Sequence, residues 1–210
     1  MSIDAILLIG PTGAGKSPLG DHIQERGLSG KRCHHFDFGH QLRAIAAEEK
    51  PPGEFTFAEH RFVRDLLEKA LLLEKEHFLI AEKIVSSFLG SRQYEQGDLV
   101  VLNGLPRHVG QARDMDQIVA VRTVVVLECS SSVVHKRICR DTGGDRAGRD
   151  DDDQLLIEKK LRIFRERTEP LVEHYRAEGS VIVRLAVTAE AAADHVYAEL
   201  LSLVPQASSV

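Results

Sequence analysis

Residues 10–17 constrain the fold of this chain more than any other segment. They read Gly-Pro-Thr-Gly-Ala-Gly-Lys-Ser, a complete G-x-x-x-x-G-K-[ST] pattern, and they directly follow the apolar run at 6–9. The three glycines remove side chains from this turn, so that its main-chain N–H groups can face phosphate oxygens. A helix beginning near Lys16 would point the positive end of its dipole at the same place. The pattern therefore predicts a buried strand, a phosphate-binding loop and a helix.

This loop indicates binding of a nucleoside triphosphate, with the Lys16 ammonium on its β and γ phosphates and the Ser17 hydroxyl on magnesium. The loop residues expected to bind ATP are Gly10, Thr12, Gly13, Ala14, Gly15, Lys16 and Ser17. The alternative is a glycine-rich turn that connects a strand to a helix and binds no ligand.

Composition narrows the class of protein. The chain has 210 residues, a formal net charge of −5 and a pI near 6.1, which argues against a nucleic-acid binder that relies on bulk positive charge. Its three cysteines are scattered and form no C-x-x-C pair, so neither a disulfide framework nor a zinc site is expected. The N-terminal segment lacks the features of a signal peptide or a membrane span. We therefore expect a cytoplasmic protein with no membrane or nucleic-acid partner.

Apolar runs of strand length alternate with stretches of helical periodicity, which is typical of an α/β protein. The expected strands are 6–9, 33–36, 99–102, 123–127 and 181–185. Because the runs are continuous rather than alternating, we expect a mostly parallel sheet covered on both faces. An apolar stripe from Phe62 to Leu71 predicts a helix that packs against the core.

Two stretches do not fit a minimal alternation of strands and helices. Residues 37–90 are too long for a single crossover and contain a break at 48–53, so they predict an inserted helical flap. Residues 137–153 are rich in Arg, Asp and Gly and predict a charged loop.

A second motif, Asn103-Gly104-Leu105-Pro106-Arg107 followed by Gln111-Ala112, comes directly after the apolar run at 99–102. It is similar to the D-G-F-P-R-x-x-x-Q-A signature of adenylate kinases. Other segments resemble that family in the same order: Gly39-His40-Gln41-Leu42-Arg43 (G-D-x-L-R), Leu79-Ile80-Ala81-Glu82 (L-V-P-D), Gly148-Arg149-Asp150-Asp151-Asp152 (G-R-x-D-D) and Thr168-Glu169-Pro170-Leu171 (T-x-P-L), with Tyr175 beyond the last. The resemblance spans about residues 5 to 200 and is to the short-lid, zinc-free form of the nucleoside monophosphate kinases.

The resemblance implies one domain with a three-layer P-loop NTPase fold and a mostly parallel five-stranded sheet. The core would comprise residues 1–36, 91–136 and 154–210, with a flap for the monophosphate at 37–90 and a short lid at 137–153. Transfer between two anionic nucleotides depends on positioning and on converging positive charges, for which guanidinium groups are well suited.

The resemblance also implies residue roles. Lys16, Arg137, Arg140 and Arg149 would act on the transferring phosphoryl group, and Arg137 would contact ATP. The acceptor would be bound by Phe38, Arg43, Leu79, Ile80, Gly104, Arg107, Gln111 and Arg149. Arg43 and Arg107 would hold its phosphate and Gln111 its base, while Ser17, and Asn103 through water, would hold Mg²⁺. For Arg43 and Arg107 the alternative is an ordinary surface arginine paired with a carboxylate.

Several positions depart from the family pattern, and one of them is His40, which replaces an aspartate. Asn103 replaces an aspartate, which removes a charge from the expected metal site. Lys160 stands where the family has an arginine, and a lysine cannot form a bidentate fork. Phe38 replaces a threonine that contacts the acceptor base. Pro18 follows Lys16-Ser17, where the family has glycine and threonine.

The resemblance thus implies an enzyme that transfers the γ-phosphate of ATP to a nucleoside monophosphate with magnesium, with AMP as the expected acceptor and a monomer as the expected state. Two alternatives stay open at this point. One is a nucleotide-binding sensor or partner-binding module with impaired transfer, and the other is a P-loop kinase for another small substrate.

Overall fold

The structure, a computed structural model, describes residues 3–69, 71–144 and 154–204. These residues form one parallel sheet of five strands in the order β2-β3-β1-β4-β5. The strands are β1 (Ile3–Ile9), β2 (Cys33–Asp37), β3 (Leu99–Asn103), β4 (Val119–Glu128) and β5 (Val181–Ala186). The predicted α/β class, the strand number and the parallel arrangement are confirmed.

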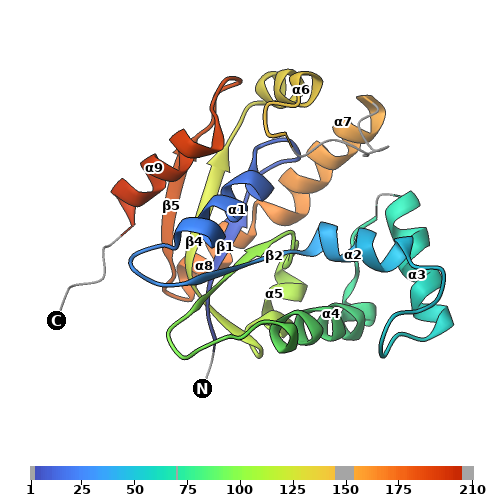
Figure 1. The fold of residues 1–210 in the computed structure, drawn as a ribbon. Coiled ribbons are helices and arrows are strands. Elements are labelled where there is room, and N and C mark those ends of the chain that lie inside the picture. Colours follow the sequence, from blue (N-terminus) through green and yellow to red (C-terminus); the bar gives the residue numbers. More distant parts are fainter. Residues whose placement is uncertain (1–2, 70, 145–153, 205–210) are drawn as a thin grey trace.

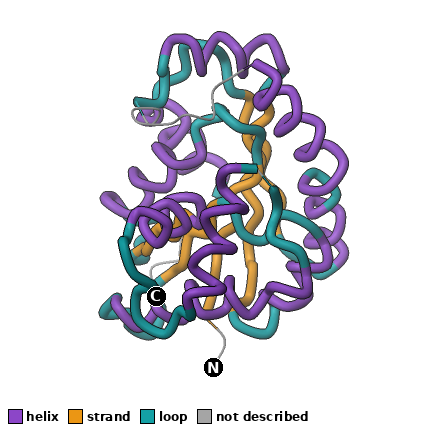
Figure 2. Tube along the Cα trace, turned by 90° about the vertical axis from the view of Figure 1, so that its right-hand side faces the viewer, coloured by secondary structure: helices purple, strands orange, loops and turns teal. Residues whose placement is uncertain are grey.

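Helices cover both faces of the sheet, which gives three layers (Figures 1 and 2). Helices α1 (Lys16–Arg26) and α9 (Ala193–Leu203) pack against one face, where Ile6 and Leu8 of β1 point. Helices α4 (Phe78–Ser91), α5 (Val109–Met115) and α8 (Leu171–Ala177) pack against the other face, where Leu7 and Ile9 point. Alternate residues of the central strand are therefore buried in opposite layers, which explains its continuous apolar run.

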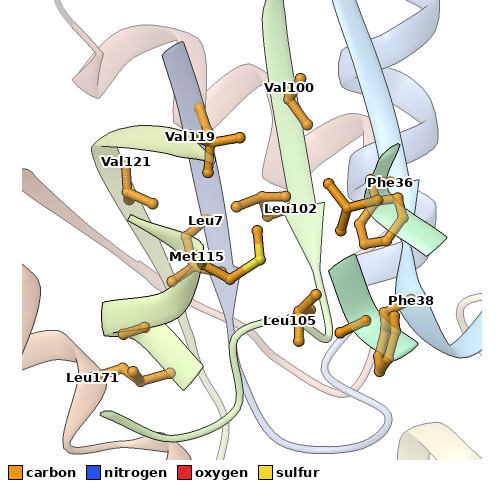
Figure 3. Packing of buried hydrophobic residues seen from close by; sticks show 14 of the residues in the cluster. Leu7, Phe36, Phe38, Val100, Leu102, Leu105, Met115, Val119, Val121 and Leu171 are labelled. Atoms are coloured by element: carbon orange, nitrogen blue, oxygen red, sulfur yellow. The ribbon is translucent and has the colours of Figure 1, made fainter. Parts of the chain in front are cut away.

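The second of these cores extends to the carboxyl ends of the strands. Figure 3 shows Leu7, Leu102 and Met115 at its centre, with Phe36 and Phe38 at one side. Phe36 and Phe38 lie with their ring centroids 6.2 Å apart, and both are buried. The residues that follow the strands are thus attached to a rigid core.

The segment between β2 and β3 contains three helices of its own. They are α2 (Phe38–Ala47), α3 (Phe57–Glu68) and α4, with a short 3₁₀ turn at Lys75–His77. Helix α3 begins with a capping box, in which the side chain of Thr56 accepts from the N–H of Glu59 and the Glu59 carboxylate accepts from the N–H of Thr56. The break expected at 48–53 falls between α2 and α3, which lie beside the sheet in Figure 1.

Helices α6 (Ser131–Arg140) and α7 (Gln154–Ile163) pack together through Val134, Ile138, Ile157 and Leu161. A π-helical turn at Phe164–Thr168 connects α7 to α8. No helix in the described ranges combines the length and the apolar character that crossing a bilayer requires.

The predicted stripe from Phe62 to Leu71 belongs to the core only in part. Val63 and Leu66 are buried in α3, as expected. Leu71 lies beyond the end of α3 and is 48% exposed, so the prediction that it packs in the core is wrong. Its side chain lines the cavity described below.

Candidate active site

The phosphate-binding loop has the predicted geometry. It follows β1 at the centre of the sheet, and α1 begins at Lys16. Gly13 and Gly15 have φ angles of 74° and 93°, in the left-handed region that favours glycine. An added Cβ would lie 2.8 Å from Ile138 at Gly13 and 3.0 Å from Arg137 at Gly15, so α6 also leaves no room for side chains there.

The Lys16 ammonium lies over this loop. Its Nζ donates to the main-chain oxygens of Gly10 and Pro11, each at 2.8 Å. Both bonds hold the positive charge at the point where the loop N–H groups and the N-terminus of α1 favour an anion. Of the seven predicted loop residues, Ala14 is buried, and the other six line the cleft: Gly10, Thr12, Gly13, Gly15, Lys16 and Ser17.

Ser17 is part of a polar cluster with the last residues of β2 and β3. Its Oγ donates to Oδ2 of Asp37 at 2.5 Å. Asn103 Nδ2 donates to the same carboxylate oxygen at 2.9 Å and to Ser17 Oγ at 3.1 Å. Asp37 and Asn103 are partners in the register of the two strands. The sheet therefore places a carboxylate next to the hydroxyl of the phosphate loop.

The surroundings of Asp37 keep this carboxyl group ionised. Burial alone would raise its pKa, but hydrogen bonds from Ser17 and from the main-chain N–H of His40 lower it. The side chains of His35 and Arg43 act in the same direction, and together these influences place the pKa below its ordinary value. A negative charge is thus present at the expected metal site despite the asparagine at 103.

A cavity of about 200 Å³ extends from the phosphate loop to α2 and the end of α3. Arg43 of α2 and Arg107 beyond β3 both line it, together with Lys16. The carboxyl ends of β1, β2 and β3 form its floor, which is where open parallel sheets bind ligands. The structure therefore brings together the lysine and the two arginines that the sequence selected.

Arg107 is held by its main chain, while its guanidinium has no ion pair among the described residues. Its N–H donates to Gln111 Oε1 at 2.8 Å, and its carbonyl accepts from Thr168 Oγ1 at 2.8 Å. Burial lowers the pKa of Arg107, and no described carboxylate offsets that effect. A desolvated cation without a counterion is a strong site for an anion.

The side of the cavity formed by α2, the end of α3 and the segment after it is apolar. Its lining residues there include Phe38, Leu42, Leu66, Leu71 and Leu72. Gly104 lines it from the core with a φ of 83°, and an added Cβ would lie 3.6 Å from Phe38. This wall offers a flat ring a hydrophobic surface next to the two arginines.

Three of the predicted acceptor residues do not line the cavity. Leu79 is 68% exposed on α4, and Ile80 is buried in the core on the same helix. Gln111 is also buried, and its Nε2 donates to the carbonyl of Leu73 at 2.7 Å, while its Oε1 accepts from Arg107. In this structure the Gln111 amide is therefore directed at main-chain groups rather than at a ligand.

The two described arginines expected near the transferring group, Arg137 and Arg140, differ in burial and in their partners. Arg137 is buried, and its Nε donates to the carbonyl of Gly13 at 2.9 Å, so it contacts the phosphate loop. Its Nη1 donates to Thr188 and Ala191. Arg140 is exposed and bonds Glu190 at 3.1 Å. Arg149 lies outside the described residues, whereas Lys160 of α7 lines the cavity.

Two contacts connect the segment that follows α3 to α7 and to the π-helical turn. Arg167 forms a bidentate pair with Glu74 at 2.7 and 2.8 Å, and Lys159 Nζ donates to the carbonyl of Lys69 at 2.9 Å. The hydrogen bond from Arg167 lowers the pKa of Glu74. These bonds hold α7 close to the end of α3.

Sequence reasoning missed Asp37. The signal was present, since an aspartate follows the apolar run at 33–36 and polar residues at the carboxyl ends of parallel strands gather at one edge. It was not found because the second strand was short and its place beside β3 was unknown.

Comparisons with known proteins agree with this geometry. A family model described as adenylate kinase matches residues 8–180. An adenylate kinase of Thermus thermophilus is 30% identical over 202 residues, which cover 93% of this chain and 94% of the relative. Those of Synechococcus sp. (strain CC9311) and Prochlorococcus marinus (strain MIT 9303) are 32% and 27% identical, over 83% of this chain and 85% of each relative. Since the family match spans the phosphate loop and both cavity arginines, this chain belongs to the adenylate kinase family and is a phosphotransferase.

Proposed function

We propose that this enzyme transfers the γ-phosphoryl group of ATP to a nucleoside monophosphate, with AMP as the preferred acceptor and Mg²⁺ as cofactor. Membership of the adenylate kinase family supports nucleoside monophosphate kinase activity with ATP as the donor. The observation that carries the proposal is the cavity that Lys16, Arg43 and Arg107 line together. Three cations that line one cleft suit two anionic partners, a nucleoside triphosphate and a nucleoside monophosphate.

The donor and acceptor ends of the cavity differ in chemistry. At the donor end, Lys16 and the loop N–H groups would hold the β and γ phosphates of ATP. At the acceptor end, Arg43 and Arg107 would grip the monophosphate. The attacking atom would be a phosphate oxygen, which is already largely ionised near neutral pH. The transfer therefore needs positioning and charge stabilisation rather than a base that removes a proton.

The donor set at the end of the phosphate loop suits magnesium. Ser17 offers a hydroxyl oxygen and Asp37 a carboxylate, and Asn103 Nδ2 donates to both. Oxygen donors are those that Mg²⁺ prefers, and it takes its remaining ligands from water and phosphate. The described residues hold no group of three or more His, Cys, Asp or Glu that would form a closed protein cage. When bound, the ion would neutralise charge on the β and γ phosphates.

The apolar wall would hold the acceptor base, with the Phe38 ring and the leucines of α2 and α3 against it. The family pattern implies that Gln111 hydrogen-bonds the adenine base. To do so, its amide must break the hydrogen bond to the Leu73 carbonyl and form one to the base instead. We propose that acceptor binding makes this exchange, because Leu73 follows directly on Leu72, which lines the apolar wall of the cavity.

Other properties follow from the same proposal. Donor and acceptor groups all come from one chain, which supports a monomer. The three cysteines are free, which is consistent with the reducing cytoplasm. The expected partners are ATP and a nucleoside monophosphate.

An acceptor screen tests the proposed function. ADP formation from ATP is followed in a coupled assay with AMP, CMP, UMP, GMP and dAMP as acceptors. We expect turnover with at least one acceptor and the highest kcat/KM with AMP. Absence of turnover with all five would refute the kinase proposal, and tight ATP binding without product would favour the nucleotide-sensor alternative.

A further inference from the structure

We propose that the carboxylate of the magnesium site is supplied by Asp37 at the end of β2, and that Asn103 at the end of β3 acts as the residue that positions it. Asn103 would thus not face the ion, although the family pattern places the metal-facing aspartate at this position. The inference rests on the proposed function for the presence of the metal and goes beyond it in assigning the residue.

The hydrogen-bond pattern fixes the orientation of the Asn103 amide. Its Nδ2 lies 2.9 Å from Asp37 Oδ2 and 3.1 Å from Ser17 Oγ. A carboxylate accepts hydrogen bonds and cannot donate one, so the amide must turn its N–H groups rather than its oxygen towards Asp37. An N–H group carries positive partial charge, so the atom of Asn103 nearest to the cluster is repelled by a cation.

Asp37 has the opposite character. One of its carboxylate oxygens, Oδ2, accepts from both Ser17 and Asn103, and an oxygen atom carries the negative partial charge that attracts a cation. The hydroxyl of Ser17 donates its proton to this oxygen, which leaves a lone pair of Ser17 for a metal ion. The other oxygen, Oδ1, accepts from the N–H of His40 at 2.9 Å and so fixes the carboxylate at the N-terminus of α2. Asp37 is thus held rigidly beside the phosphate loop.

The pairing of β2 and β3 explains how the carboxylate of the metal site can be supplied by either strand. β2 and β3 are adjacent and parallel, and Asp37 and Asn103 are directly paired in register. The two side chains therefore lie next to each other at the carboxyl end of the sheet, where a hydrogen bond joins them. An aspartate on one strand and an asparagine on the other supply the same pair of groups in either order.

The test measures nucleotide binding rather than turnover. Affinity for the β,γ-imido analogue of ATP is measured by titration calorimetry with Mg²⁺ and with EDTA, and the ratio of the two dissociation constants is the metal-dependent gain. In Asp37→Asn this gain should fall by about 10- to 100-fold, the usual effect of losing a group that orients a metal site. Binding in EDTA should be unchanged or tighter, because a negative charge near the phosphates is removed. Asparagine also caps helices, so α2 should remain intact.

Two further variants make the test specific. The double variant Asp37→Asn/Asn103→Asp moves the carboxylate to the neighbouring strand and should restore the gain to within a few-fold of wild type. Asp65→Asn removes an exposed carboxylate of α3 and should leave the gain unchanged. A full gain in Asp37→Asn, or no recovery in the double variant, would overturn the assignment. Because the readout is binding, a protein that fails the acceptor screen still gives a clear result here.

Discussion

Replacing Arg107 by methionine separates a functional arginine from a structural one. Methionine keeps the aliphatic length of the side chain and removes the positive charge of this half-buried residue. If the guanidinium holds the acceptor phosphate, the variant loses a charge-assisted pair in a desolvated pocket, which costs about 2 to 4 kcal/mol. That loss corresponds to roughly 30- to 900-fold in kcat/KM for the acceptor. The KM for ATP should change little, because in the proposed function the donor is held by Lys16 and the loop.

The same substitution should not destabilise the free protein. Arg107 has no ion pair among the described residues, and burial lowers its pKa, so removing the charge relieves a desolvation cost. We expect the free energy of unfolding in urea to stay the same or to rise by about 1 kcal/mol. Arg113→Met, on the exposed side of α5, is the matched control and should change neither quantity. An Arg107→Met protein that loses more than about 2 kcal/mol of stability while keeping its acceptor kinetics would refute the reasoning.

Three other predictions concern packing and charge. Gly20→Ala should lower Tm, because the added Cβ would lie 2.3 Å from His35 Nε2. This clash costs about 1 to 3 kcal/mol, which is more than alanine gains in helix propensity. Gly90→Ala, with open space around its Cβ, should instead raise stability by about 0.5 to 1 kcal/mol, and equal effects at both sites would contradict this account. Glu74→Gln should cost less than about 1 kcal/mol at pH 7, because the pair with Arg167 is partly exposed. Since that pair lowers the pKa of Glu74 from 4.5, the difference from wild type in urea unfolding should shrink as the pH falls below 4.5, and a difference independent of pH would disprove it.

The sequence predicted the centre of the fold because the decisive interactions there are local. A buried strand, glycines at fixed spacing and a helix start determine the phosphate loop without reference to distant residues, and Gly13 and Gly15 adopt the expected conformation. The continuous apolar runs likewise predicted a parallel sheet. Arg43 and Arg107 line one cavity because both follow strands whose carboxyl ends lie at the same edge.

Other parts of the site depend on contacts between residues that are far apart in the sequence. The amide of Gln111 can bond a ligand or the main chain, and the pairing with Leu73 and Arg107 favours the main chain in this structure. The metal-site charge was expected to be missing because Asn103 was considered without its neighbour in the sheet. Strand order placed Asp37 beside it, and no local pattern contains that information.

The fate of a labelled γ-phosphate tests the central claim most directly. The enzyme is incubated with Mg²⁺, AMP and ATP that carries ³²P in its γ position, and the products are separated. We predict that the label appears in the β position of newly formed ADP, at a rate that depends on AMP. Label found only in inorganic phosphate, or retained in ATP, would contradict the account that Lys16, Arg43 and Arg107 bring two nucleotides together for direct transfer.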